Sequence, residues 1–422
     1  MSSIRRARIG LLTSNSLCHN PRVMKAADAL ARAGHEVVVF GAWLDPAFKA
    51  RDQRLIESSP FTFTPVLDLT LHGLRAEATR FVERARRKSA QLAYGLTGRP
   101  SPLQLGLGVR RLVDAAARQN ADLYIAHSEP GLYAARELLR RGCRVGVDME
   151  DWFSEDLLPQ ARRHRPLALL RSLERELLTD GAYGSCPSYA MSAALAREHQ
   201  CDEPAVIYNA FAWADRQALG ETLIDRRDRD IPSIHWFSTT VGPGRGLEDL
   251  VAALPLLKCD VEIHLRGNPA PGFDEWIKTS LPDRWRHKVF FHPLVPNDRL
   301  LAHIAEHDVG FAGEMKYCRS RDLTVTNKIL HYLIAGLAVV ASDTAGQREV
   351  AAAAPEAVLV YPSGDAAALA ETLNTLLASR EWLQEAKAAA LAAAHATFCW
   401  ERQEGTLLDA VARALARPLA AA

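Results

Sequence analysis

The sequence predicts an α/β protein made of two doubly wound parallel sheets, one in each half of the chain. Short apolar segments recur along all 422 residues, and amphipathic stretches with helix-starting and helix-ending residues separate them. The chain is too long for a single ordinary core, so two domains of roughly 200 residues each are expected. The alternation restarts after the charge-dense segment 212–231, which we interpret as a linker.

The first half begins with a strand, a helix and a second strand. The segment 9–12 is a short apolar strand, and Asn20 followed by proline marks the start of a helix. The segment 35–40 returns as the second strand. The same pattern recurs between residues 122 and 148, where a helix over about 130–141 joins two strands. Such alternation predicts parallel strands with helical crossovers.

The second half follows the same pattern. Its first strand, at 234–237, leads into a glycine-rich loop and a helix. Further strands are predicted at 261–265, 289–291, 309–311, 337–341 and 358–361. The chain ends in an alanine-rich helix over about 402–417, whose apolar side needs a partner surface. We therefore expect domains at 1–211 and 232–398, followed by a final segment at 399–422.

Composition excludes several classes of protein. The 51 Lys and Arg residues balance 50 Asp and Glu residues, so the overall charge does not favour a nucleic-acid partner. Seven cysteines without a C-x-x-C pair argue against a disulfide framework or a structural zinc. The basic N-terminus lacks the apolar stretch of a signal peptide, and no apolar run is long enough to span a bilayer. These features favour a cytosolic protein.

Residues 79–93 form a basic stretch inside the first half. One interpretation is a helix that docks on a membrane surface and gives the protein a peripheral membrane contact. The other is an arginine-rich helix exposed to solvent, because Phe81, Val82 and Leu92 are the bulky apolar residues in this stretch.

Ligands of doubly wound sheets collect beyond the carboxyl ends of the strands, so the loops that follow the strands are candidate sites. In the first half, the loop with Ser14 and Asn15 ends at Asn20, a helix N-terminus suited to an anion or to sugar hydroxyls. The loop lacks G-x-G-x-x-G, which disfavours a dinucleotide cofactor. His127 directly follows a strand, where it acts either as a general base or as a hydrogen-bond donor to phosphate, or only as a cap of the local turn.

The acidic segment 148–151 also follows a strand of the first half. Asp148, Glu150 and Asp151 superficially resemble a D-x-D metal site for nucleotide diphosphates. A solvated acidic turn that caps the next helix is the alternative, because no further metal-ligating residues accompany it at metal spacing.

The second half contains features of a phosphate site. Arg245 and Gly246 belong to a glycine-rich loop that does not match a P-loop. The helix that begins near Thr326 carries Asn327, Lys328 and His331, which share one face by their spacing. The next helix starts with Gln347 and Glu349 nearby. An exposed Lys328 at a helix N-terminus is disfavoured by the helix dipole, so we interpret it as a phosphate ligand.

These residues resemble the retaining glycosyltransferases of the GT-B fold, specifically the group 1 or family 4 class that uses nucleotide-diphosphate sugars. The strongest similarity is between 326–343 and the donor-binding block of that family. The other segments that carry the resemblance are 20–23, 34–39, 121–127, 206–209, 346–349 and 398–401.

The resemblance implies two Rossmann-like halves that face each other across a cleft, with the final helix crossing back to the N-terminal domain. The second half would bind the nucleotide sugar and the first the acceptor, without a metal or cofactor. Arg245 and Lys328 would hold the diphosphate, and His331 would face the ribose. His127 would lie near the transferred sugar.

One departure from the family separates the possible functions. The family's donor block usually carries two glutamates separated by seven residues, and Leu323 and His331 stand at the matching positions. Asp322 or Glu314 in the preceding loop would have to substitute. The leading hypothesis is a retaining, metal-independent transferase that moves a sugar, from a donor such as a UDP sugar, to a glycan, lipid-linked or small-molecule acceptor. The alternatives are a catalytically silent nucleotide-sugar-binding or scaffold protein of the same fold and a nucleotide-sugar epimerase.

Overall fold

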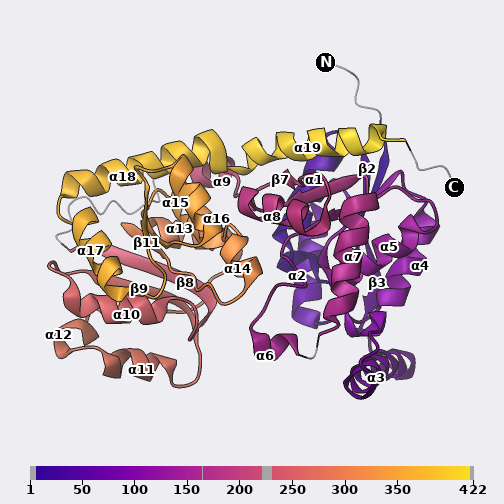
Figure 1. Cartoon of the computed structure of the whole chain (residues 1–422), viewed down its shortest axis with the longest axis horizontal. Coiled ribbons are helices and arrows are strands. Elements are labelled where there is room, and N and C mark those ends of the chain that lie inside the picture. The colour runs from indigo at the N-terminus through magenta and orange to yellow at the C-terminus, as the bar shows by residue number, and fades with distance from the viewer. Residues whose placement is uncertain (1–5, 164, 221–230, 419–422) are drawn as a thin grey trace. The chain divides into compact units, whose positions relative to one another are not determined.

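The computed structural model describes residues 6–163, 165–220 and 231–418. These residues fold as two compact units (Figure 1). Within the described residues, unit 1 comprises the chain up to Pro187, Met191–Ile207 and the chain from Glu404, and unit 2 comprises Ser188–Ala190 and the chain between Tyr208 and Gln403. Of the predicted linker, residues 212–220 are described and include helix α9 (Trp213–Ala218), whereas 221–230 lie outside the described residues.

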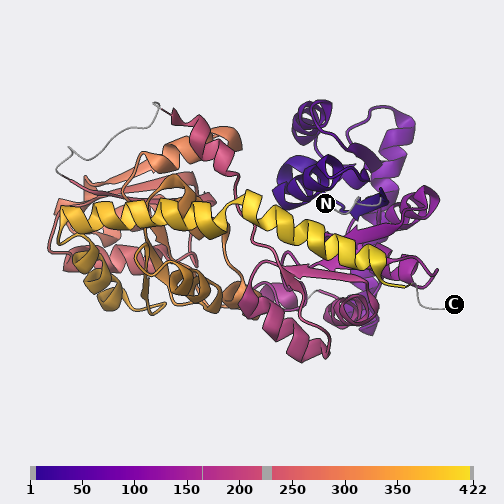
Figure 2. The ribbon, with the colours of Figure 1, turned by 90° about the horizontal axis from the view of Figure 1, so that it is seen from above.

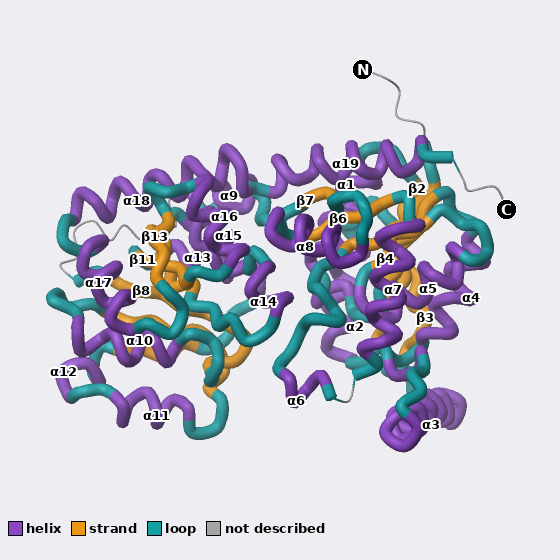
Figure 3. The backbone as a smooth tube through the Cα atoms, viewed as in Figure 1, coloured by secondary structure: helices purple, strands orange, loops and turns teal. Residues whose placement is uncertain are grey.

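Unit 1 contains a seven-stranded parallel sheet in the order β3-β2-β1-β4-β5-β6-β7. Its strands are β1 (Arg8–Leu12), β2 (Glu36–Trp43), β3 (Thr62–Asp68), β4 (Leu123–Ala126), β5 (Val145–Asp148), β6 (Tyr183–Cys186) and β7 (Ala205–Val206). Its helices are α1 (Pro21–Arg32), α2 (Pro46–Glu57), α3 (Leu74–Thr97), α4 (Val109–Gln119), α5 (Ser128–Leu139), α6 (Pro159–Arg162), α7 (Leu167–Asp180) and α8 (Tyr189–His199). The inner strands are apolar on both sides because helices cover both faces of the sheet (Figure 3).

Unit 2 contains a six-stranded parallel sheet in the order β10-β9-β8-β11-β12-β13. Its strands are β8 (Ser233–Val241), β9 (Glu262–Pro269), β10 (Val289–His292), β11 (Val309–Ala312), β12 (Ala338–Ser342) and β13 (Val358–Tyr361). Its helices after α9 are α10 (Leu247–Ala253), α11 (Phe273–Ser280), α12 (Asp283–Arg286), α13 (Asn297–Ala305), α14 (Arg319–Leu323), α15 (Asn327–Ala335), α16 (Ala345–Ala353), α17 (Ala366–Leu376) and α18 (Arg380–Ala393).

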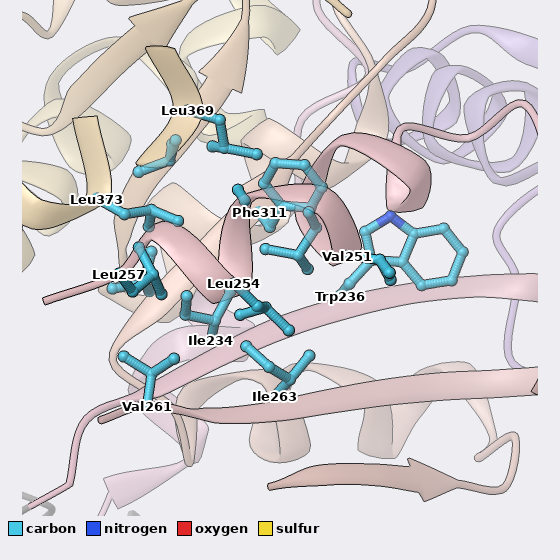
Figure 4. Packing of buried hydrophobic residues seen from close by; sticks show 14 of the residues in the cluster. Ile234, Trp236, Val251, Leu254, Leu257, Val261, Ile263, Phe311, Leu369 and Leu373 are labelled. Carbon is cyan, nitrogen blue, oxygen red and sulfur yellow. The ribbon is translucent and has the colours of Figure 1, made fainter. Parts of the chain in front are cut away.

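A large hydrophobic cluster of unit 2 lies on one face of its sheet. Trp236, Ile263 and Phe311 project from neighbouring strands and pack against Leu254 and Leu373 of the covering helices (Figure 4). Each of these side chains is almost completely buried, so together they supply a large part of the hydrophobic stabilisation of this unit.

The last helix, α19 (Trp400–Ala416), is drawn in yellow with α18 in Figure 2. From Glu404 onward it groups with unit 1. The Arg144 guanidinium donates a hydrogen bond to the carbonyl of Arg417 at 2.9 Å, and Arg417 in turn donates to the carbonyl of Gly181 at 3.0 Å. The end of the helix is thereby attached to the loops between strands of unit 1. Residues 419–422 of the predicted final segment lie outside the described residues.

The predicted strands are confirmed, and three further strands appear at the sheet of unit 1. The missed strands are β3, β6 and β7. β3 and β7 occupy the two edges of the sheet, where strands are short or polar. β3 contains Pro65, which is tolerated at an edge and hides the strand from a search for continuous apolar runs.

Helix α3 is longer than the predicted stretch 79–93, because it begins at Leu74 and ends at Thr97. Within the described part of the chain, no helix combines the length and the apolar character that a bilayer crossing requires.

Candidate functional site

In both sheets the order in which strands are added reverses beside the first strand, so later strands lie on its other side. In unit 1 the reversal lies between β1 and β4, and in unit 2 between β8 and β11. Loops leaving neighbouring strands diverge at such a point, and the crevice beyond the carboxyl ends of these strands is the usual ligand site of doubly wound sheets. Each unit therefore has a candidate site whose position follows from its topology.

In unit 1, His127 lies at this point, directly after β4. Its Nδ1 is 3.0 Å from Oε1 of Glu150 and 3.4 Å from Oδ2 of Asp148. Because a carboxylate only accepts hydrogen bonds, Nδ1 carries a hydrogen, and the ring is held in one orientation. The other ring nitrogen, Nε2, is buried without a hydrogen-bond partner among the described residues. The histidine is thus positioned by two carboxylates and keeps one nitrogen for a ligand.

Asp148 is in turn held by Arg22, which sequence reasoning did not identify. Two guanidinium nitrogens of Arg22 bind the two carboxylate oxygens at 2.6 and 2.7 Å, and a third donates to the carbonyl of Ile207 at 2.6 Å. Burial alone would raise the pKa of Asp148, but the Arg22 charge holds this pKa below its ordinary value. The interpretation of this segment as a solvated acidic turn is therefore wrong for Asp148, which is buried. The one sequence signal for Arg22 is a cation on the first turn of a helix, beside its apolar face.

The structure brings three predicted residues of unit 1 together. Asn20 caps α1 by accepting a hydrogen bond from the backbone of Val23, and its amide nitrogen lies 3.4 Å from Oε2 of Glu150. Glu150 therefore connects Asn20 to His127. Ser14 lies outside this group, with its hydroxyl 3.4 Å from that of Ser128, and the Asn15 backbone pairs with Ala42.

Among the described residues, the group that could hold a metal ion is His127 with Asp148 and Glu150. A divalent cation there would have to share Asp148 with Arg22, whose buried guanidinium already binds both carboxylate oxygens. The chemistry of this set suits a histidine oriented by carboxylates better than a metal centre.

In unit 2, Lys328 forms a close ion pair. Its ammonium lies 2.6 Å from Oε1 of Glu314, and the exposed fractions of the two side chains are 12% and 6%. Arg321 is 3.9 Å from the other carboxylate oxygen. The expectation of an exposed lysine without a structural partner at this helix start is therefore wrong, because Glu314 neutralises the charge that the helix dipole disfavours.

The backbone of Glu314 is fixed by neighbouring loops. The Ser342 hydroxyl accepts from the amide of Glu314 and donates to its carbonyl, both at 2.8 Å, and Ser363 donates to the same carbonyl at 3.0 Å. Gln347 is fully buried, and its amide nitrogen donates to the carbonyl of Ser342 at 2.9 Å. Its Oε1 has no partner within the described ranges. Glu314 and Gln347 are thus held at the ends of β11 and β12.

The polar residues at the start of α15 contact three different neighbours. Lys328 turns toward Glu314, whereas Asn327 accepts a hydrogen bond from the side chain of Asn209 at 2.9 Å. The ring of His331 lies against Phe211, with 3.4 Å between the ring centroids. The three side chains lie on the predicted helix α15 and contact different neighbours. Thr326 occupies the N-cap position, and its hydroxyl is buried without a partner among the described residues.

Arg245 and Gly246 lie beside β11 because of a close backbone approach. Gly246 adopts φ +78°, and a Cβ there would lie 2.7 Å from the carbonyl carbon of Gly313. The loop after β8 is thereby packed against the end of β11, next to Glu314. The Arg245 side chain is exposed and donates to the hydroxyl of Ser238 at 3.0 Å.

Two acidic residues of unit 2, Glu349 and Asp322, accept hydrogen bonds from backbone amides. Glu349 accepts from the amides of Tyr189 and Ala190, at 3.2 and 2.9 Å, and from the hydroxyl of Tyr208 at 3.0 Å. Burial raises the pKa of Glu349. Asp322 accepts from the amide of Ala345 at the start of α16. Of the two possible substitutes for the missing glutamates, Glu314 is thus paired with Lys328, and Asp322 caps a helix.

Two doubly wound sheets in one chain, each with polar loops at the point of reversal, define the GT-B class of two-domain α/β proteins. Residues 232–379, which lie in unit 2, match the family model described as Glycosyl transferases group 1. The predicted resemblance to group 1 glycosyltransferases of the GT-B fold is thereby confirmed.

Solved structures of this fold match nearly the whole chain. Sucrose-phosphate synthase from Thermosynechococcus elongatus has a TM-score of 0.68 and 16% identity, covering 97% of this chain and 100% of that chain. HepE from Anabaena in complex with UDP-glucose has a TM-score of 0.66 and 15% identity, covering 96% and 99%. UDP-GlcNAc 2-epimerase from Neisseria meningitidis bound to UDP-GlcNAc has a TM-score of 0.55 and 11% identity, covering 96% and 99%. No curated protein sequence matches this chain at a significant level.

Proposed function

We propose that this protein transfers a sugar from a nucleotide-diphosphate sugar, with UDP as the preferred nucleotide, to a hydroxyl of a glycan, lipid-linked or small-molecule acceptor. The observation that carries the proposal is the arrangement around the start of α15. There, the Lys328 ammonium and the N-terminal end of the helix occur together beyond β11 and β12 with the Thr326 hydroxyl, which has no hydrogen-bond partner among the described residues. This combination suits a diphosphate. The names of the similar proteins, which include complexes with UDP sugars, support UDP.

In the proposed reaction, the bond between the anomeric carbon and the diphosphate breaks, and the acceptor oxygen forms the new bond on the same face of the sugar. The acceptor proton passes to the leaving diphosphate. Lys328 and Arg245 stabilise the negative charge that develops on the leaving group, so no metal is required. In unit 1, Nε2 of His127 contacts a hydroxyl of the transferred sugar, while Glu150 and Asp148 hold the ring in place.

A ligand panel tests the donor half of the proposal. The melting temperature of the purified chain is measured with UDP, GDP and ADP and with their sugars, because a ligand that binds the folded state raises it by mass action. We expect UDP and one UDP sugar to raise it, and EDTA to leave the shift unchanged. An absence of any shift with all three nucleotides would contradict the proposal. Retention is checked by the anomeric NMR signal of the product.

A specific observation favours each of two other functions, a nucleotide-sugar-binding protein without turnover and a nucleotide-sugar epimerase. Leu323 and His331 stand where the family usually has glutamates, which favours a nucleotide-sugar-binding protein without turnover. The similarity to a 2-epimerase favours conversion of the donor itself. Incubation of the donor alone, followed by product analysis, distinguishes epimerisation from transfer. Calorimetry that shows donor binding without turnover on any acceptor would favour the silent protein.

A further inference from the structure

Helix α3 presents an apolar stripe to solvent. The exposed fractions of Leu74, Phe81, Leu92 and Leu96 are 87%, 74%, 61% and 88%. At 100° per residue, these four side chains lie within an arc of about 60° along the helix. The stripe therefore runs along nearly the whole length of α3. The sequence alone suggested a thin apolar side because the stretch 79–93 leaves out Leu74 and Leu96.

The opposite side of α3 attaches the helix to unit 1. Glu83 and Ala90 are buried and lie about half a turn away from the stripe. Glu83 accepts hydrogen bonds from the amide of Gly108 at 3.1 Å and from Arg111 at 3.2 Å. Tyr94 donates to the carbonyl of Arg165 at 3.2 Å. The helix is thus fixed in rotation with its apolar stripe outward, at the margin of unit 1 away from the strands (Figures 1 and 3).

The charges on α3 are mostly positive. The helix carries six cations and two carboxylates, and one carboxylate, Glu83, is buried in the contact with unit 1. The cations are Arg75, Arg80, Arg84, Arg86, Arg87 and Lys88. Arg84 and Lys88 flank one side of the stripe, and Arg75 and Arg86 flank the other, all of them exposed.

We infer that α3 docks this protein on an anionic lipid bilayer, lying parallel to the surface. Leucine and phenylalanine side chains enter the boundary between headgroups and acyl chains, while the flanking cations contact lipid phosphates. The stripe between Leu74 and Leu96 is about 33 Å long and straight, which suits a planar surface. A second copy of the chain fits this stripe less well, because pairing two stripes would bring two sets of cations together.

Vesicle sedimentation of the full chain tests this inference without reference to catalysis. The probes are vesicles of phosphatidylcholine alone and of phosphatidylcholine with phosphatidylglycerol in equal parts. We expect binding to the anionic vesicles that weakens as salt rises, and little binding to the neutral ones. The variant Phe81→Ser/Leu92→Ser should lose binding about tenfold, since both side chains are exposed and their loss leaves the fold intact. Arg84→Gln/Lys88→Gln should weaken binding to anionic vesicles alone.

Matched controls change the same residue types elsewhere. Leu256→Ser/Trp382→Ser removes apolar side chains that are 52% and 55% exposed on unit 2. Arg118→Gln/Arg413→Gln removes two exposed cations outside α3. Both controls should bind like the unchanged chain. Equal binding to neutral and anionic vesicles, no binding to either, or binding unaffected by the α3 changes would overturn the inference. So would light scattering that shows a dimer lost in the Phe81→Ser/Leu92→Ser variant.

Discussion

The pair of Lys328 and Glu314 illustrates how one residue can serve both folding and binding. Glu314 neutralises the lysine in the absence of a ligand, which offsets the unfavourable position of a cation at a helix N-terminus. A diphosphate would add negative charge at the same place, so Lys328 and the nearby Arg321 must then serve two anions. Substitution of Glu314 by a neutral residue removes the carboxylate that Lys328 balances. A variant that lacks both charges therefore separates the contribution of Lys328 to stability from its contribution to ligand binding.

We expect Lys328→Met to lower the free energy of unfolding by about 3 kcal/mol, because it removes the closer of the two cations beside the buried carboxylate of Glu314 and leaves only Arg321, 3.9 Å away. Lys328→Met/Glu314→Gln should recover most of this stability but not UDP binding. Urea unfolding and calorimetry with UDP measure the two effects. Lys387→Met, which breaks the 2.9 Å pair with Asp308 in the same unit, is the control and should bind UDP normally. Normal UDP affinity in the double variant would show that Lys328 is structural only.

His127 should affect transfer rather than donor binding. Its ring is fixed by Glu150 and Asp148, and only Nε2 remains for a ligand. We expect His127→Gln to lower kcat about 100-fold with an unchanged affinity for UDP. Transfer kinetics and calorimetry provide the two readouts. His35→Gln, at another buried histidine of unit 1, is the control; a similar loss of kcat in both variants would assign His127 a structural role.

At the scale of elements, the loop between β8 and α10 is positioned by contact between two backbones. Gly246 and Gly244 both adopt a left-handed conformation, with φ of +78° and +72°. A Cβ at Gly246 would meet the backbone of Gly313, whereas a Cβ at Gly244 would meet none of the described residues within 4 Å. The two positions therefore form a matched pair that separates conformational strain from loss of the close approach.

We expect Gly246→Ala to lower the free energy of unfolding by about 2 kcal/mol and to weaken UDP binding, because the loop with Arg245 must move away from β11. Gly244→Ala should cost about 1 kcal/mol from strain alone and leave UDP binding unchanged. Chemical denaturation and calorimetry measure both. Equal effects of the two substitutions on UDP affinity would argue against a role for the close approach.

At the scale of the whole molecule, one face of the sheet in unit 2 carries a layer of histidines. His235 and His264 are paired in register on β8 and β9, and the His264 ring is hydrogen bonded to His292 of β10 at 2.9 Å. His235 stacks on His307, with 4.6 Å between ring centroids. Other charged groups around this layer include Arg266, His303, Glu262, Glu306, Asp308 and Lys387.

Burial of His235 holds its pKa well below the ordinary value, with further lowering by Arg266. The unfolded chain therefore binds a proton at pH values where folded His235 remains neutral. Stability should fall as the pH drops below about 6.5, by about 1.4 kcal/mol per pH unit for this one group. Urea unfolding across pH 5 to 8 checks the slope, and His235→Phe should reduce it. An unchanged slope in that variant would assign the acid sensitivity to other groups.

The local pattern predicted most elements of both sheets correctly. For example, the apolar run 337–341, which lies between Gly336 and polar residues, predicted β12. Such a prediction succeeds because the hydrophobic pattern of a strand or helix depends only on residues close in the sequence. The edge strands β3 and β7 of unit 1 escaped prediction, since β3 is interrupted by Pro65 and β7 is two residues long. The sequence pattern of 79–93 did not favour membrane docking over a solvent-exposed helix. The bounds of α3 and the direction of its exposed face were needed to favour docking.

The sequence by itself determined the fold class and the loops that carry polar groups, because strand and helix signals are local and parallel sheets direct those loops to one edge. Only the tertiary structure decided which groups meet: Arg22 with Asp148, Glu150 between Asn20 and His127, and Glu314 with Lys328. The members of the Arg22 pair lie more than 120 residues apart in the chain. Such contacts depend on how strands are ordered in a sheet, and this order cannot be inferred from the residues of any one segment.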